Sequence, residues 1–82
     1  MIIKHNNINY ELLWCSDIIR DGMYLELSKL HTTPLEQMAE VFYSDVTNEF
    51  TFSCFVENIP LDLIELLIEK AKETLPPINK EE

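Results

Sequence analysis

Hydrophobic residues recur at about every second position over residues 8–57 and at intervals of three and four over residues 61–75. Alternation predicts β-strands with one buried face, whereas intervals of three and four predict an α-helix with one apolar stripe. We therefore expect the element order ββββα. A four-stranded antiparallel sheet with one C-terminal helix on one face is a two-layer α+β fold. We predict a single domain over residues 1–82, with loose ends at residues 1–6 and 76–82.

Residues that favour turns separate the predicted strands. The expected strands are residues 8–15, 23–30, 39–44 and 49–57. Asp21 and Gly22 favour a turn between the first and second strands, and a short polar turn joins the third strand to the fourth. Between the second and third strands, Thr33, Pro34 and Glu36 fit a capping box with proline at the first helical position. We therefore predict a short helical turn there.

The helix is expected to follow Pro60 and to stop before Pro76 and Pro77. At 100° per residue, one broad sector of this helix is apolar and should face the sheet. The residues of this sector are Leu61, Ile64, Leu67, Ile68, Ala71 and Leu75. Leu63 and Leu66 lie off the sector, and the opposite side carries a stripe of carboxylates that a solvated helix face would also show.

The inner face of the sheet should contribute the other half of the core. An even-numbered turn after Ser44 sets Tyr43 opposite Phe50 and makes one face of that hairpin apolar, whereas a slip of one residue would not. The same reasoning places one apolar face on the first hairpin. The predicted inner residues are Tyr10, Leu12, Trp14, Met23, Leu25, Leu27, Ala39, Val41, Tyr43, Phe50, Phe52 and Cys54.

The opposite face of the sheet has no second long helix to cover it. This face carries aromatic and aliphatic side chains among carboxylates, with almost no positive charge. Aromatic anchors surrounded by polar groups are typical of protein interfaces, although a solvated sheet face is the alternative. We therefore predict that this face binds a partner. The predicted partner-binding residues are Glu11, Leu13, Tyr24, Glu26, Glu40, Phe42, Phe55 and Glu57.

Acidic residues outnumber basic ones by fifteen to six, which gives a formal net charge of −9. Such a charge repels nucleic acids and anionic membranes and accelerates encounter with basic proteins, although it would also serve solubility alone. No apolar run is long enough to span a membrane, and the first residues do not resemble a signal peptide. We expect a cytoplasmic protein that binds neither nucleic acid nor membrane.

Reactive residues are few and scattered along the chain. Cys15 and Cys54 lack metal-ligand spacing and should lie on opposite faces of the sheet, so we predict free thiols. His5 and His31 also have no carboxylate or cysteine at metal-ligand spacing. Phosphate-binding, dinucleotide-binding and nucleophile motifs do not occur in the sequence. We therefore expect no metal, no cofactor and no catalytic activity.

A polar group around the first predicted turn is the nearest approach to a catalytic constellation. Asp17, Arg20 and Asp21 could form a small site, because a carboxylate near a cation can transfer protons. No nucleophile, base or orienting residue lies near them in the sequence, so we interpret them as parts of a loop.

These features favour an interaction protein that neutralises or regulates a basic partner, such as a bacterial immunity or inhibitor protein that neutralises a toxin. The comparison rests on size and charge alone, since no family motif occurs. The alternative is a homodimer of structural or regulatory role. In that case the glutamates of the outer face oppose face-to-face pairing and favour pairing through edge strands. A third possibility is a small-molecule-binding protein, for which the sequence offers almost no polar constellation.

Overall fold

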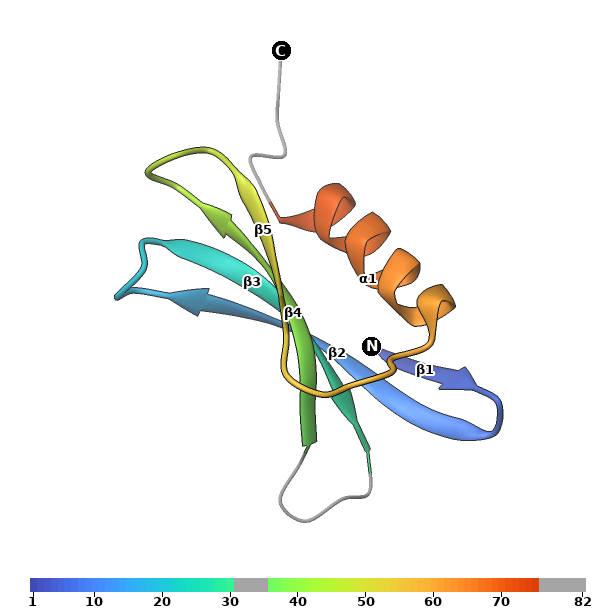
Figure 1. The fold of residues 1–82 in the computed structure, drawn as a ribbon. Coiled ribbons are helices and arrows are strands. Elements are labelled where there is room, and N and C mark those ends of the chain that lie inside the picture. The colour runs from blue at the N-terminus through green and yellow to red at the C-terminus, as the bar shows by residue number, and fades with distance from the viewer. Residues whose placement is uncertain (31–35, 76–82) are drawn as a thin grey trace.

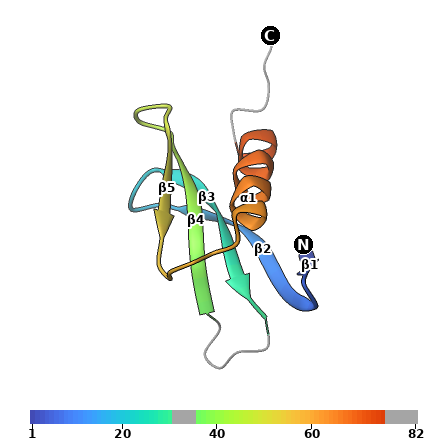
Figure 2. The ribbon, with the colours of Figure 1, turned by 45° about the vertical axis from the view of Figure 1, so that its right-hand side comes forward.

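The structure is a computed structural model that describes residues 1–30 and 36–75. In this part of the chain a five-stranded antiparallel sheet carries one helix on one face (Figures 1 and 2). The elements are β1 (Ile2–His5), β2 (Ile8–Asp17), β3 (Gly22–Lys29), β4 (Glu36–Ser44), β5 (Phe50–Cys54) and α1 (Leu61–Thr74). The strands follow one another in chain order across the sheet. The predicted α+β class, antiparallel sheet and C-terminal helix are confirmed.

The predicted number of strands is wrong, because β1 adds a fifth strand within residues that we expected to form a loose end. β1 pairs with β2, and the ammonium group of Met1 donates a hydrogen bond of 3.0 Å to the carbonyl oxygen of Leu12. Asn6 and Asn7 make the tight turn between these strands with φ of 50° and 65°. Asparagine tolerates this left-handed conformation better than most residues, so the Asn-Asn pair is the signal that was missed.

The predicted register of the β4–β5 hairpin is confirmed, and so are the faces predicted for the β2–β3 hairpin. In the β2–β3 hairpin, Leu12 lies opposite Leu27. In the β4–β5 hairpin, Tyr43 lies opposite Phe50. A bulge between β3 and β4 leaves Met38 without a partner in β3, because Leu27 pairs with Ala39 while the next residue of β3 pairs with Gln37. The predicted inner and outer faces therefore stand, but Trp14, Met23, Phe50, Phe52 and Cys54 of the predicted inner set are exposed and lie outside the buried core.

The core lies between the inner face of the sheet and α1, which packs over β3 and β4. Its buried apolar residues are Tyr10, Leu12, Leu25, Leu27, Met38, Ala39, Val41, Tyr43, Leu63, Leu67, Ala71 and Leu75. The indole of Trp14 joins the helix to β2 by donating a hydrogen bond of 2.6 Å to the hydroxyl of Thr74. Trp14 itself remains partly exposed at the margin of the core.

The buried stripe of α1 is rotated from the predicted sector. Leu63 is 2% exposed, whereas Leu61, which was expected in the core, is 66% exposed. Val56 and Ile59 pack against the core just before the helix begins, whereas Leu61 lies outside it. The stripe then follows a spacing of four from Leu63 to Leu75.

Two sequence predictions fall outside the described residues. These are the helical turn that begins at Thr33 and the loose end at residues 76–82. Glu36, which we assigned to that helical turn, is the first residue of β4.

Candidate functional site

The outer face of the sheet, opposite α1, is the surface predicted to bind a partner, and no described helix or strand covers it (Figure 2). Cross-strand pairing arranges its central residues in two rows. One row is Leu13, Glu26, Glu40 and Ser53, and the next is Cys15, Tyr24, Phe42 and Thr51. Five of the predicted residues therefore lie side by side across β2, β3 and β4.

The other three predicted residues lie around this centre. Glu11 pairs with Ser28 across the first hairpin and with Ile2 of β1. Phe55 is exposed just after β5, and its backbone N–H donates a hydrogen bond of 2.8 Å to Met38. Glu57 lies in a bend beyond the strand, so its predicted position on the sheet is wrong. The strand ends at Cys54, earlier than expected, and Val56 packs against the core beyond it.

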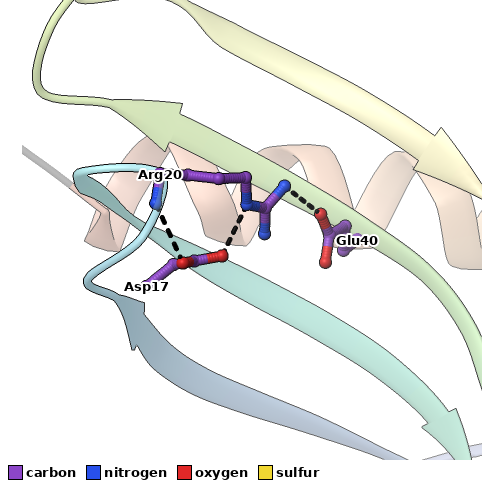
Figure 3. Close-up of polar contacts among 3 residues, drawn as sticks. All are labelled: Asp17, Arg20 and Glu40. Carbon is purple, nitrogen blue, oxygen red and sulfur yellow. Dashed lines mark hydrogen bonds and ion pairs between the residues drawn. The ribbon is translucent and has the colours of Figure 1, made fainter.

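The turn between β2 and β3 brings Arg20 back over the outer face (Figure 3). The carboxylate of Asp17 accepts a hydrogen bond of 3.1 Å from the backbone N–H of Arg20 and a second one from its Nε. The Nη1 of Arg20 then donates to Oε2 of Glu40 on β4 at 2.9 Å. One guanidinium group thus joins the turn to the middle of the sheet.

The same guanidinium lies over two aromatic rings. Its Cζ is 4.2 Å from the ring centre of Phe42 and 5.5 Å from that of Tyr24. A cation held this close to a ring is attracted by its negative face. Glu40 and Phe42 are consequently only 6% and 8% exposed. The expectation that this face carries almost no positive charge, with both residues available to a partner, is wrong.

Gly22 makes the packing of Phe42 possible. A Cβ at this position would lie 2.6 Å from the ring of Phe42 and 2.2 Å from the carbonyl oxygen of Tyr43. Such distances are far below van der Waals contact, so the ring occupies space that only glycine leaves open. The Asp21-Gly22 pair, which favours a turn in the sequence, is therefore also a packing requirement of the outer face.

The hydrogen bonds between Arg20 and its partners change the pKa values of Asp17 and of Arg20 itself. The hydrogen bonds from Arg20 hold the pKa of Asp17 below its usual value. The hydrogen bonds to Asp17 and then to Glu40 raise the pKa of Arg20. Asp17 and Arg20 therefore remain charged over the whole neutral range. Their hydrogen bonds hold the β2–β3 turn in a fixed position on the sheet.

Tyr24 is the other group of the outer face whose acidity is changed. Its hydrogen bond with Cys15, followed by burial and the charges of Cys15, Glu26 and Glu40, raises the pKa of Tyr24 to about 12. Removing a proton from this phenol would place a new negative charge among existing carboxylates. Tyr24 is therefore a neutral hydrogen-bonding group on this surface.

Apolar side chains are also exposed at the tips of two neighbouring hairpins. Ile18 and Ile19 are almost fully exposed in the turn that carries Arg20, and Val46 is exposed in the β4–β5 turn. The two turns are joined because the backbone N–H of Asp45 donates to the carbonyl oxygen of Asp21 at 2.8 Å. Sequence reasoning missed the two isoleucines, although two adjacent isoleucines in a turn are themselves an unusual signal.

A groove of about 230 Å³ opens on the inner side of the molecule, between α1 and the edge strand β5. It is lined by Val41, Phe50, Thr51, Phe52, Ile68 and Lys72. The helix covers β3 and β4 but leaves the rings of β5 partly exposed. The groove is therefore the unfilled margin of the hydrophobic core.

Cys15 and Cys54 are free thiols, as predicted. Within residues 1–30 and 36–75, no helix is long and apolar enough to cross a membrane. Over the same residues, no group of three or more His, Cys, Asp or Glu side chains is placed to hold a metal ion. Comparison with known proteins finds no matching family, no matching curated protein and no matching solved structure.

Proposed function

We propose that this chain is a small acidic interaction protein without catalytic activity, which neutralises or regulates a basic protein as an immunity or inhibitor protein does. The observation that carries the proposal is the open outer face of the sheet, held in one shape by the contacts of Arg20 with Glu40 and Phe42. A surface that is ordered before it meets its partner loses less conformational freedom on binding.

The chemistry of the remaining surface supports a basic partner. Leu13, Tyr24 and Phe55 offer apolar contact area, and the turn isoleucines extend it beyond the sheet. Glu26 supplies a carboxylate within the outer face and Glu57 supplies one beyond the end of β5, and the net charge of −9 steers a positively charged protein toward the chain. This docking surface differs from the one predicted from the sequence, because Glu40 and Phe42 contact Arg20 and are buried.

The first test measures binding to a partner captured from an extract of the protein's own cells. The immobilised chain should retain a basic protein, whose identity mass spectrometry establishes and whose affinity surface plasmon resonance measures. Phe55→Ser and Ile19→Ser should each weaken binding by about tenfold or more, because each removes an exposed apolar anchor. Leu61→Ser is the matched control, since it removes an exposed apolar side chain from the helix, and it should leave affinity unchanged.

A second test separates steering from non-specific charge. Glu57→Lys should slow association by about threefold at low salt, and the difference should disappear at high salt. Glu69→Lys makes the same charge change on the exposed side of α1 and should have a smaller effect. A captured protein that is acidic, or equal effects of both reversals, would contradict the proposal.

A further inference from the structure

β5, which forms a free edge of the sheet, differs from the other strands in its charge. β1 contains Lys4, and β2, β3 and β4 each contain at least one carboxylate, but Phe50–Cys54 has no charged residue. Natural proteins protect exposed strand edges with charges, proline or bulges, and β5 has none of these. In a chain of net charge −9, this strand is therefore an edge that adds no charge of its own to the repulsion between two copies.

The direction of the backbone groups of β5 follows from its pairing with β4. Ser44 donates to the carbonyl oxygen of Glu49 at 3.0 Å, and Phe55 donates to Met38 at 2.8 Å. Hydrogen-bonding groups alternate in direction along an antiparallel strand, so the residues that point toward β4 are the odd-numbered ones. The N–H and C=O groups of Phe50, Phe52 and Cys54 consequently point toward the free edge, where no described strand pairs with them.

We infer that β5 pairs antiparallel with β5 of a second copy, about a two-fold axis at Phe52. In this register Phe52 lies opposite Phe52, Phe50 lies opposite Cys54, and Thr51 lies opposite Ser53. Each outward N–H and C=O then meets a complementary group, because the even-numbered residues form hydrogen-bonded pairs. A shift of this register would leave an outward group at one end of the strand without a partner.

Side chains support the same arrangement. A two-fold axis normal to the sheet keeps the inner faces of both copies on one side, so the exposed rings of Phe50 and Phe52 from both copies meet beside the two grooves. Aromatic cross-strand pairs stabilise antiparallel sheets. The acidic residue before the strand, Glu49, lies opposite Phe55 and not opposite another carboxylate. The outer faces remain free, so this inference does not depend on the proposed function.

Disulfide trapping tests the register directly. In a Cys15→Ser, Cys54→Ser background, Phe52→Cys places two thiols opposite each other at about 5.5 Å between Cα atoms, a separation that a disulfide spans. Mild oxidation should convert most of this variant to a covalent dimer. Val46→Cys in the same background is the control, because its side chain is 71% exposed against 43% for Phe52, and random collision would therefore favour it. Equal or greater cross-linking through Val46→Cys overturns the inference.

Light scattering then tests the association without a covalent bond. The wild type should have twice the mass of one 9.6 kDa chain, and rising salt should strengthen the dimer because it screens the repulsion between acidic chains. A basic partner would show the opposite salt dependence. A mass of one chain at all concentrations and salts overturns the inference, as would a segment of another protein bound at this edge in place of the second copy.

Two substitutions of Phe52, the residue at the two-fold axis, separate the contribution of its side chain to dimerisation from that of its backbone N–H. Phe52→Ala should raise the dimer dissociation constant by about tenfold, because it removes the central aromatic pair. Phe52→Pro should abolish dimerisation, because it also removes an outward N–H while breaking no hydrogen bond to β4, a position where edge strands tolerate proline. Circular dichroism checks that both variants fold. If the proline variant does not fold, the cross-linking experiment still decides the outcome.

Discussion

The two faces of the sheet are covered in different ways. On the inner face, α1 buries aliphatic residues such as Leu27 and Leu67 completely. On the outer face, the single side chain of Arg20 lies across Phe42 and forms an ion pair with Glu40. A 14-residue helix covers the inner face, whereas one residue of a turn covers part of the outer face.

This difference has physical consequences for how each face responds to change. Apolar burial is non-directional, and its strength follows the area removed from water. The guanidinium cover depends on the geometry of a few hydrogen bonds and on the charges of Asp17 and Glu40. The inner face should therefore carry most of the stability, while the outer face should be sensitive to substitution of single polar atoms and to pH.

The largest expected effect concerns the inner face and the rotation of α1. Leu63→Ala should lower the free energy of unfolding by about 2–5 kcal/mol, because it leaves a cavity beneath the helix. Leu61→Ala, two residues earlier, should change it by no more than about 0.5 kcal/mol, because that side chain is exposed. Urea denaturation of both variants measures the difference. The reverse order would restore the helix orientation that the sequence periodicity predicts.

A smaller effect is expected on the outer face. Arg20→Ala should lower the free energy of unfolding by about 1–2 kcal/mol, because the buried carboxylate of Glu40 loses its partner. This value is below that of a fully buried pair, since the side chain of Arg20 is 42% exposed and solvent screens the interaction. Arg20→Lys should recover only part of the loss, because an ammonium group cannot reproduce the planar fork.

A double-mutant cycle with Glu40→Gln shows whether the pair acts as a unit. The combined variant should be more stable than the sum of the two single changes implies, with a coupling energy of about 0.5–1 kcal/mol. Additive losses would mean that Arg20 covers the rings without a specific contribution from Glu40, and the description of the outer face as held by an ion pair would then fail.

The smallest effect should appear only at alkaline pH. Because the pKa of Tyr24 is raised from 10.0 to about 12, the folded state holds this proton more tightly than the unfolded chain does. The stabilisation is therefore fully present below about pH 10 and is lost as the pH rises through 12. Tyr24→Phe should remove this part of the pH dependence, by about 1 kcal/mol near pH 11.

Urea denaturation between about pH 9 and pH 11 measures this slope. Cys15→Ala is the informative companion, because it removes the hydrogen bond that is the largest cause of the shift. Ultraviolet titration of the phenols should then show the pKa of Tyr24 moving back toward 10.0. An unchanged titration in this variant would show that burial and the nearby carboxylates suffice.

Local patterns determined much of the fold. Alternation over the strands set which residues face inward, and the burial of Tyr43 and Val41 shows why a one-residue slip is excluded. The limits of α1 followed from Pro60 before its start and from Pro76 and Pro77 in the sequence after its end. The same local reasoning missed β1, because two asparagines are a weaker turn signal than asparagine followed by glycine.

Only part of the candidate site could be predicted from the sequence. Alternation was sufficient to place Leu13, Tyr24 and Glu26 on one face, because parity along a strand is a local property. It could not show that Glu40 and Phe42 are withdrawn from solvent, since the residue that covers them lies 20 positions away from Glu40 in the chain. Arg20 lies within a turn, where periodicity carries no information about side-chain direction.

The sequence by itself thus determined four of the five strands, the helix, the register of the β4–β5 hairpin and the two faces of the sheet, because short-range periodicity and turn chemistry decide these. The tertiary structure alone decided the rotation of α1, the cover that Arg20 forms over Phe42, and the direction in which the backbone of β5 points. These features depend on which segments meet in space and on the volume left between them. Such long-range packing has no signature in a local pattern of hydrophobic and polar residues.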